Sequence, residues 1–415
     1  MSRFDSILET RLKRKTQTCK VFEVKIDLSH LSQKSLKHLY SLFTEAKWFY
    51  NYCISQEKLD TADTTLKSVP IKVKDEFENR NFSVLKSHMK QGIKTRIFTA
   101  IKSLSSHKKK GHKVGKIRFR TQINSIPLPE FHKDFDIKDK NTIRLSGLKQ
   151  KVKVIGLKQI PKDCEISNAT LIRKSSGFYF HITTFTTKEE RIVPEASIGI
   201  DFGCQTQMTL SDGTKIEFQV PISKRLKRLD RKITRKQFNG KLRDKSKKKY
   251  QDQIKRQREY EKLTNQKKDI KNKVVSVLTN NFKYICFQDE SIHAWHAGNH
   301  GKKIQNSGIG GIISDLKNKS VTPIEVNKFF PSTQLCPECG DKHKLSLNER
   351  IYVCNKCRYT KDRDVKSAIC IEKEGLKQIP LDERNFKARE SSTSAFFDTL
   401  NKINGIKVSK LYSTI

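Results

Sequence analysis

Acidic residues at three widely separated points of the sequence could together hold divalent metal ions. Asp201 lies in an apolar segment that contains glycines, Ile198–Gly203. Asp289 and Glu290 directly follow a second apolar segment, and Asp364 stands at the start of a predicted helix. Mg²⁺ prefers carboxylate oxygens, and two such ions can activate water and stabilise the leaving oxygen when a phosphodiester is hydrolysed. These acids are therefore candidates for a two-metal nuclease site.

The glycines beside Asp201 bear on how such a site would be reached. Gly199 and Gly203 have no side chain, and a glycine in a strand often marks a close approach of a ligand or of another backbone. We expect them to leave room for a metal ion and a phosphate. A single aspartate after a strand is more often a turn or helix-cap residue, so the interpretation depends on the other acids.

Two pairs of cysteines predict a structural zinc site. Cys336 and Cys339 form one C-x-x-C motif, and Cys354 and Cys357 form another after 14 intervening residues. Each motif places two thiolates on one tight turn, and two turns complete a tetrahedral site. Redox dithiols and free thiols are the alternatives, and neither needs two matched motifs. Four thiolate ligands leave no open position for a catalytic water, so we expect one structural Zn²⁺ that supports folding of this segment.

The net charge of the chain predicts a polyanionic partner. The 415 residues carry a net charge of +41, with 35% hydrophobic residues, and nucleic acid is the polyanion that best relieves such self-repulsion. No apolar run approaches the roughly 18 residues of a membrane span, and Met1–Lys20 lacks the apolar core of a secretory signal. The six cysteines outside the motifs are scattered and predict reduced thiols. We therefore expect no membrane association and a reducing compartment.

The first 190 residues are predicted to be rich in strands, with helices inserted near the start. Alternating apolar residues predict a strand at 19–28. Apolar residues spaced by three or four predict helices at 36–53 and 85–104, on either side of a polar stretch. A basic loop, 106–113, ends the helical part. Glycines separate the short strands expected after it, which are 116–120, 142–145, 152–155, 169–173 and 178–184.

The second half opens with the strand around Asp201 and a hairpin whose turn is 211–213. Residues 222–273 then hold 22 Lys or Arg against 6 Asp or Glu, a net charge of +16. A sparse apolar seam predicts a long helix pair, broken near Asn239-Gly240, that also contacts phosphates; a solvated basic face is the alternative. The elements expected after it are a strand at 283–288, a loop at 289–303, a helix at 309–317, a strand at 321–326, a hairpin of 345–347 with 350–353, and a helix at 365–373.

The motifs together resemble a known family of nucleases. IGIDFG, YICFQDE, the paired cysteines and TKDRDVKSA occur in the order found in split RuvC-type nucleases with an inserted zinc ribbon. This arrangement resembles transposon-encoded TnpB proteins and the compact type V CRISPR effectors related to them. The segment GKIRFR to NSIPL and the helix ending WFYNYC are similar to the N-terminal half of TnpB. The resemblance covers most of residues 15–375, and the ribbon with the DRD motif is its most specific part.

The resemblance implies roles for individual acids. Asp201 matches the first catalytic aspartate, and Asp364 matches the last. Many relatives carry Glu-Asp-Leu after the middle strand, which would align Gln288 with the catalytic glutamate, and glutamine supplies no charge. In an extended chain Gln288 and Glu290 share a face while Asp289 points away. We therefore favour Glu290 as the middle acid, with Asp289 and a site lacking this acid as the alternatives. The expected cofactors are two catalytic Mg²⁺ and one structural Zn²⁺.

The family implies an RNA-guided DNA endonuclease. Such a protein binds a structured guide RNA, checks a short motif beside the target, and lets base pairing read double-stranded target DNA. One protein per guide RNA is favoured over a dimer. The expected location is the cytoplasm of a prokaryote, in association with the nucleoid. The alternative is a nuclease-inactive or weakly active guide-dependent DNA-binding regulator. A transposon-encoded origin and a CRISPR-associated one both stay open. The residues expected to contact nucleic acid are Lys108, Lys109, Lys110, Arg225, Arg228, Lys302 and Lys303.

The resulting fold prediction is an α+β protein of several domains. Its N-terminal part would be a β-barrel-like wedge module with an inserted helical recognition domain. Its C-terminal part would be an RNase H-like (RuvC) α/β nuclease domain with an inserted zinc ribbon. The expected boundaries are 1–30 and 115–190 for the wedge module, 31–114 for the helical insertion, 191–330 and 360–380 for the nuclease domain, 331–359 for the ribbon, and 381–415 for a loosely held tail.

Overall fold

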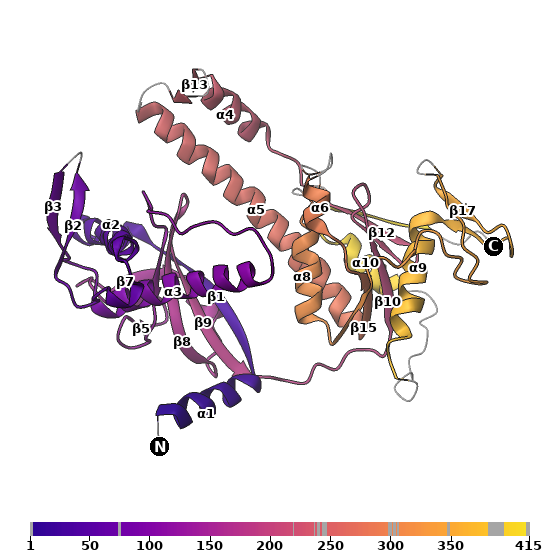
Figure 1. Ribbon diagram of the computed structural model, residues 1–415, viewed down its shortest axis with the longest axis horizontal. Helices are drawn as coiled ribbons and strands as arrows, with labels where there is room; N and C mark the ends of the chain where they lie inside the picture. The colour runs from indigo at the N-terminus through magenta and orange to yellow at the C-terminus, as the bar shows by residue number, and fades with distance from the viewer. Residues whose placement is uncertain are drawn as a thin grey trace. The chain divides into compact units, whose positions relative to one another are not determined.

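The chain has an α+β fold and divides into two compact units, Met1–Glu189 and Glu190–Ile415 (Figure 1). The computed structural model describes residues 3–73, 76–218, 220–235, 237–238, 241–242, 247–297, 301, 304, 307–346, 349–380 and 394–411. Within these residues no helix is long and apolar enough to cross a membrane.

The first unit is built on a seven-stranded antiparallel sheet that is nearly closed, like a barrel. Its strand order is β4-β8-β9-β1-β7-β6-β5. The edge strands β4 and β5 are consecutive in the chain, and Phe131, in the segment between them, forms an isolated bridge with Phe135 of β5. Five of the expected strands are present. The strands of this sheet are β1 (Gln17–Ile26), β4 (Ser125–Leu128), β5 (Phe135–Asp139), β6 (Thr142–Leu145), β7 (Val152–Ile155), β8 (Glu165–Lys174) and β9 (Gly177–Thr187).

Two long helices share the core of this unit with the sheet. Helix α2 (Gln33–Ser55) buries Phe43 and most of its predicted apolar stripe. Helix α3 (Ser87–Lys109) buries Met89, Ile93 and Ile97, but Ile101 is 42% exposed. The predicted stripe of α3 is therefore right for its first half and wrong for its last turns, which face solvent. A third helix, α1 (Arg3–Lys15), precedes β1.

One hairpin in this unit was not predicted, and one predicted strand is absent. The polar stretch before α3 contains a hairpin of β2 (Ser68–Val73) and β3 (Glu76–Asn81). Residues 116–120 form no strand. Instead, Asn51 of α2 donates its amide to the backbone carbonyl of Arg120 (3.0 Å) and accepts from the Arg120 N–H (2.8 Å). A side-chain amide thus satisfies backbone groups that a neighbouring strand would otherwise pair.

The second unit is built on a mixed six-stranded sheet of order β16-β15-β10-β11-β12-β19. Strands β10, β15 and β16 are parallel, and the β11–β12 hairpin and β19 continue the sheet antiparallel. The apolar segments around Asp201 and before Gln288 form strands, as predicted, and the structure shows that these strands are adjacent and parallel. The strands are β10 (Ser197–Phe202), β11 (Met208–Leu210), β12 (Thr214–Phe218), β15 (Tyr284–Gln288), β16 (Thr322–Val326) and β19 (Ile406–Lys410).

Helices pack on this sheet and extend from it. Helix α9 (Arg363–Leu376) packs on β10 and β15. The C-terminal part of α5 (Lys247–Asn281), with α8 (Ile309–Lys319) and α10 (Ser394–Asn401), forms the main core with the sheet. The predicted basic helix pair is present, because α4 (Lys224–Thr234) runs back along α5 (Figure 1). Two short strands, β13 (Gln237–Phe238) and β14 (Lys241–Leu242), lie between them, and the predicted break at Asn239-Gly240 falls outside the described residues.

Two expectations for this unit need correction. The segment expected as a loop, 289–303, contains a short helix, α6 (Ile292–Ala297). The predicted tail, 381–415, is partly built into the fold. Phe396 and Leu400 of α10 are buried in the core, and β19 pairs with β12 over five residues as the edge of the sheet. Segments 381–393 and 412–415 lie outside the described residues.

Candidate functional site

Asp201, Glu290 and Asp364 line one cavity of about 770 Å³ in the second unit. Asp201 is the second-to-last residue of strand β10, Glu290 follows β15, and Asp364 lies in the first turn of helix α9. Because β10 and β15 are adjacent and parallel, their carboxyl ends meet at the same edge of the sheet. Helix α9 packs against both strands and brings the third acid to that edge. The fold thus gathers three acids that lie up to 163 positions apart in the sequence.

The electrostatics of the cavity favour a bound cation. Burial is the main cause that raises the pKa of Asp201 to about 8, and the negative charges of the neighbouring Asp364 and Glu290 contribute to this shift. Burial also raises the pKa of Glu290, with Asp289 adding to the effect. Carboxylates that crowd together in this way are costly as free anions, and a divalent ion would remove the cost. Clustered acids with raised pKa values are typical of functional sites.

The two aspartates of the DRD motif have different roles. Asp362 is the N-cap of α9, where its Oδ1 accepts the N–H groups of Asp364 (3.1 Å) and Val365 (3.2 Å). Its other oxygen accepts from Lys215 Nζ at 2.8 Å. Asp364 instead lines the cavity, with the Arg363 guanidinium 3.4 Å from its Oδ1. Asp362 therefore holds the helix start that positions Asp364.

Gln288, the residue aligned with the family's middle acid, is tied into the protein by its amide. The side chain is only 7% exposed. The two N–H groups of its Nε2 are shared among the backbone carbonyls of Asn327 (3.1 Å), Lys328 (3.1 Å) and Phe330 (2.9 Å). Its Oε1 accepts from Ser332 Oγ at 3.1 Å. A carboxylate has no hydrogen to donate, so a glutamate at this position could not make the three carbonyl contacts.

Asp289 and Glu290 point to different surroundings. The Asp289 side chain is 58% exposed, and its Oδ1 lies 3.7 Å from Lys317 Nζ. Glu290 is half-buried and lines the cavity with Asp201. Placing Glu290 in the cavity and Asp289 outside it agrees with the strand-face argument. The catalytic role of Glu290 is a proposal that we take up below.

A glutamate in place of Gln288 should destabilise the protein and should not replace the middle acid. The Gln288→Glu change sets a buried carboxylate against three carbonyl oxygens, and an unsatisfied buried charge costs about 2–3 kcal/mol or more. We expect a lower thermal midpoint, measured by differential scanning fluorimetry. The exposed Gln122→Glu is the matched control and should leave the midpoint unchanged. Full cleavage by a Gln288→Glu, Glu290→Gln double variant would contradict the assignment.

The glycine beside Asp201 serves the helix rather than a ligand. A Cβ at Gly199 would lie 2.1 Å from the carbonyl oxygen of Ala368 and 2.7 Å from Cβ of Glu372, both in α9. Gly199 therefore lets α9 approach β10 closely, and this contact delivers Asp364 to the cavity. The expectation that this glycine leaves room for a metal ion is wrong. At Gly203, a Cβ would meet the carbonyl oxygen of Thr206 at 2.7 Å, so that turn is also closed around the backbone.

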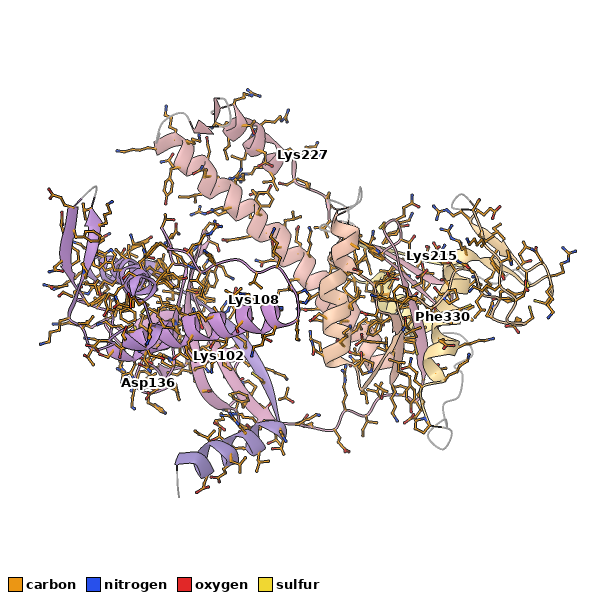
Figure 2. All side chains as sticks on the ribbon, in the orientation of Figure 1. Lys102, Lys108, Asp136, Lys215, Lys227 and Phe330 are labelled. Carbon is orange, nitrogen blue, oxygen red and sulfur yellow. The ribbon has the colours of Figure 1, made fainter. Side chains whose placement is uncertain are left out.

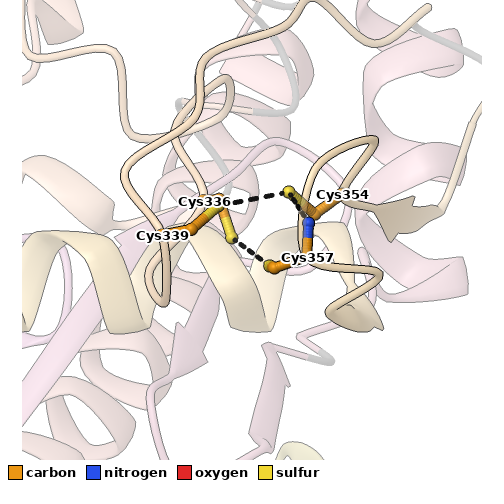
Figure 3. A group of neighbouring side chains, drawn as sticks. All are labelled: Cys336, Cys339, Cys354 and Cys357. Atoms are coloured by element: carbon orange, nitrogen blue, oxygen red, sulfur yellow. Dashed lines mark hydrogen bonds between the residues drawn. The ribbon is translucent and has the colours of Figure 1, made fainter.

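The four cysteines of the two motifs form a group that could hold a metal ion (Figure 3). Their sulfur atoms all lie within 4.8 Å of one another. The Cys336 and Cys357 sulfurs are 3.6 Å apart, and those of Cys339 and Cys354 are 3.5 Å apart. The backbone N–H of Cys357 is the main cause that lowers the pKa of the Cys354 thiol to about 6. Four convergent sulfur ligands suit a divalent ion such as zinc.

The hairpin that supports this cluster differs from the predicted one. Strand β17 (Ile351–Val353) pairs with β18 (Thr360–Asp362), which runs directly into α9. Residues 345–346 are described without strand structure. The second cysteine motif lies within this hairpin, so the cluster is joined through β18 to the helix that carries Asp364.

A buried lysine between the cysteine cluster and the carboxylate cavity was missed by sequence reasoning. Lys366 is fully buried; its Nζ donates to the Ser332 carbonyl at 2.9 Å and lies 4.3 Å from the centre of the Tyr352 ring. Ser332 in turn donates its hydroxyl to Gln288. Burial lowers the pKa of Lys366. In the sequence this residue looks like one of many surface lysines, and only its position within a helix start gives a signal.

The basic residues expected to contact nucleic acid lie on exposed helix surfaces where the structure describes them. Lys108, Lys109 and Lys110 are exposed at the C-terminal end of α3, and Figure 2 labels Lys108 there. On α4, Arg228 is exposed, while Arg225 Nε lies 3.6 Å from Glu259 of α5. The predicted residues Lys302 and Lys303 lie outside the described residues.

The comparisons with known proteins bear on the part of the chain that holds the cysteine cluster. Residues 312–371 match the family model described as Cas12f1-like, TNB domain. These residues include all four clustered cysteines and Asp364. The match confirms the predicted resemblance to TnpB proteins and compact type V effectors.

Comparisons of the chain with solved structures and with curated proteins add little to the domain match. A solved structure described as the cryo-EM structure of the Cas12f1-sgRNA-target DNA complex is similar at a TM-score of 0.48 and 12% identity, covering 86% of this chain and 99% of the other. No curated protein matches the chain. The resemblance therefore rests on the domain match over residues 312–371 and on the residues described above.

Proposed function

We propose that the protein is an RNA-guided DNA endonuclease in which Asp201, Glu290 and Asp364 hold two catalytic Mg²⁺. The observation that carries this proposal is that these three acids line one cavity. Asp364 lies within the residues that match the Cas12f1-like TNB domain, and Asp201 and Glu290 precede them in the sequence. Their carboxylate oxygens fit the preference of Mg²⁺. When bound, the ions would supply activated water and stabilise the leaving oxygen of a phosphodiester. The protein supplies the fixed geometry and the charge that attracts the ions.

The cysteine cluster is proposed to hold one structural Zn²⁺ in a ribbon of residues 331–359. This ribbon would be inserted into a RuvC-like nuclease domain of residues 191–330 and 360–380. The mixed sheet with two adjacent parallel strands ending in acids supports that assignment. In the first unit, the nearly closed sheet supports a wedge module of residues 1–30 and 115–190, with 31–114 as an inserted recognition domain.

The proposed partners are a structured guide RNA and double-stranded target DNA, with one protein per guide RNA. The net charge of +41 and the exposed lysines at the end of α3 support an extended contact with phosphates. Buried Asp252 and Glu259 in α5 pair with cations of α4 and α5, which lowers the charge between those helices. Exposed cations such as Lys227 (Figure 2) and Arg228 of α4 could contact phosphates.

The protein should purify with RNA, and removal of the RNA should end guided cleavage. A charge of +41 without its counter-ion repels itself, so nuclease treatment should also lower solubility. Sequencing of the copurified RNA and a cleavage assay on matching DNA check this. Affinity should fall steeply with salt through counterion release, and a Lys108, Lys109, Lys110→Ala triple variant should show a shallower slope.

Two outcomes would contradict the proposal in different ways. Sequence-specific cleavage by strictly RNA-free protein would remove the guide from the mechanism. Guide-dependent DNA binding without cleavage in Mg²⁺ would instead favour the nuclease-inactive regulator, the alternative raised by glutamine at position 288.

A further inference from the structure

The turn that follows β16 is held in one conformation by a buried amide. In Asn327–Phe330, the N–H of Phe330 donates to the Asn327 carbonyl (2.9 Å), and the N–H of Phe329 donates to Asn327 Oδ1 (2.9 Å). In addition, the Nε2 of Gln288 lies within hydrogen-bonding distance of three backbone carbonyls of the same turn. Surface loops are usually more mobile than the elements they connect, and these hydrogen bonds restrict the conformations open to this turn.

The fixed turn presents two neighbouring aromatic rings to different surroundings. Phe330, labelled in Figure 2, lines the cavity with the three carboxylates. Phe329 is 80% exposed, and Lys328 Nζ lies 4.8 Å from the centre of its ring. A single exposed apolar residue is common on protein surfaces and by itself needs no explanation. Here, however, the ring is held on a rigid backbone, beside a cation, one residue from the wall of the cavity.

A strand that enters this cavity needs a contact that does not depend on charge alone. Lys344, Arg350 and Arg363 also line the cavity, but its three clustered carboxylates repel a phosphate at the reaction centre until metal ions bind. Stacking of a base on an aromatic ring has no such penalty, and it tolerates any base because every base has a π-face. An enzyme whose target sequence is read by a guide must accept any sequence at its cleavage site. An exposed ring meets that requirement better than a set of hydrogen-bonding groups.

We propose that Phe329 and Lys328 form a platform on which an unpaired nucleobase of the strand being cleaved stacks, with the Lys328 ammonium beside the adjoining phosphate. This inference rests on the proposed nuclease function and names a substrate contact outside the carboxylate site. It also gives Gln288 a role: its amide fixes the turn that carries the platform.

The first test compares cleavage by variants of the guide-loaded protein. Phe329→Ala should lower kcat/KM for cleavage of the unpaired strand roughly tenfold, the effect typical of a lost base–aromatic stack. Phe329→Trp should retain activity within about twofold, because a larger ring also stacks. Val321→Ala is the control, since Val321 is a 44% exposed apolar residue just before the start of β16, at the end of that strand away from the turn, and it should leave cleavage unchanged. Binding of guide RNA and of target DNA, measured by gel shift, should not change in any variant.

The second test locates the base. Asp364→Asn protein, which should bind but not cleave, is assembled with guide RNA and target DNA carrying 2-aminopurine at successive positions near the cleavage site. One position should lose fluorescence by stacking, and Phe329→Ala should restore it. The platform proposal would be wrong, and the nuclease function would stand, if the wild type cleaves DNA, the Phe329→Ala variant cleaves equally well, and no 2-aminopurine position shows quenching that depends on Phe329. Weaker target binding by Phe329→Ala would place the ring on the guide–target duplex and contradict the proposal. Guide-loaded wild type that cleaves no DNA would overturn the nuclease function and the platform with it.

Discussion

Replacing Glu290 by glutamine should lower guided DNA cleavage by about 100-fold or more, whereas Asp289→Asn should change it by no more than a few-fold. Glu290 lines the cavity with Asp201 and Asp364, and the change removes a charge needed to hold the metal ions. The Asp289 side chain is 58% exposed and faces Lys317. Single-turnover cleavage rates across a Mg²⁺ titration check both variants. Target binding should persist, because base pairing and backbone contacts supply its energy.

The DRD motif offers a matched pair for the same prediction. Asp364→Asn removes a cavity acid and should abolish cleavage to the same extent as Asp201→Asn. Asp362→Asn keeps a good N-cap residue and loses only its ion pair with Lys215, so it should retain most activity. Cleavage that depends on Asp289 or Asp362 but not on Glu290 or Asp364 would show that the cavity acids are wrongly assigned.

Removing the metal from the cysteine cluster should unfold the ribbon and reduce cleavage through loss of structure. The binding free energy of a structural zinc site is also folding free energy, on the order of 10 kcal/mol, and β18 joins this cluster to the helix of Asp364. Elemental analysis should find about one zinc per chain. Cys336→Ser and Cys354→Ser should lower the folded yield and the thermal midpoint. Cys19→Ser, at an exposed cysteine on β1, is the matched control and should do neither.

The outcome that would contradict the zinc assignment is equally concrete. Active protein of normal thermal stability that contains no zinc by elemental analysis would show that the four thiols act without metal. A Cys354→Ser variant that folds and binds zinc normally, but cleaves slowly, would point to a direct part in the chemistry.

The sequence alone determined the elements whose pattern is local. The apolar stripe of α2 and the alternation in β1 are fixed by spacing along the chain, so both elements follow from periodicity. The cysteine motifs are similarly self-contained, because each places two sulfurs on one turn, and the four thiols do converge. The order of the acidic motifs pointed to candidate acids at the ends of a strand and a helix, and only the structure showed that β10 and β15 are parallel neighbours.

The tertiary structure decided what depends on partners far away in the sequence. Residues 116–120 look like a strand, but Asn51 takes the backbone hydrogen bonds that a neighbouring strand would make. Strand β19 looks like part of a polar tail until β12 supplies its pairing partner.

The identities of single residues in the candidate site also depend on partners that are distant in the sequence. Gly199 is glycine because a helix more than 160 residues later passes within reach of its missing Cβ. Gln288 is neutral because three carbonyls of a distant turn require a donor there. A sequence pattern specifies which face of an element is apolar, but the groups that a side chain meets are set only when the elements pack together.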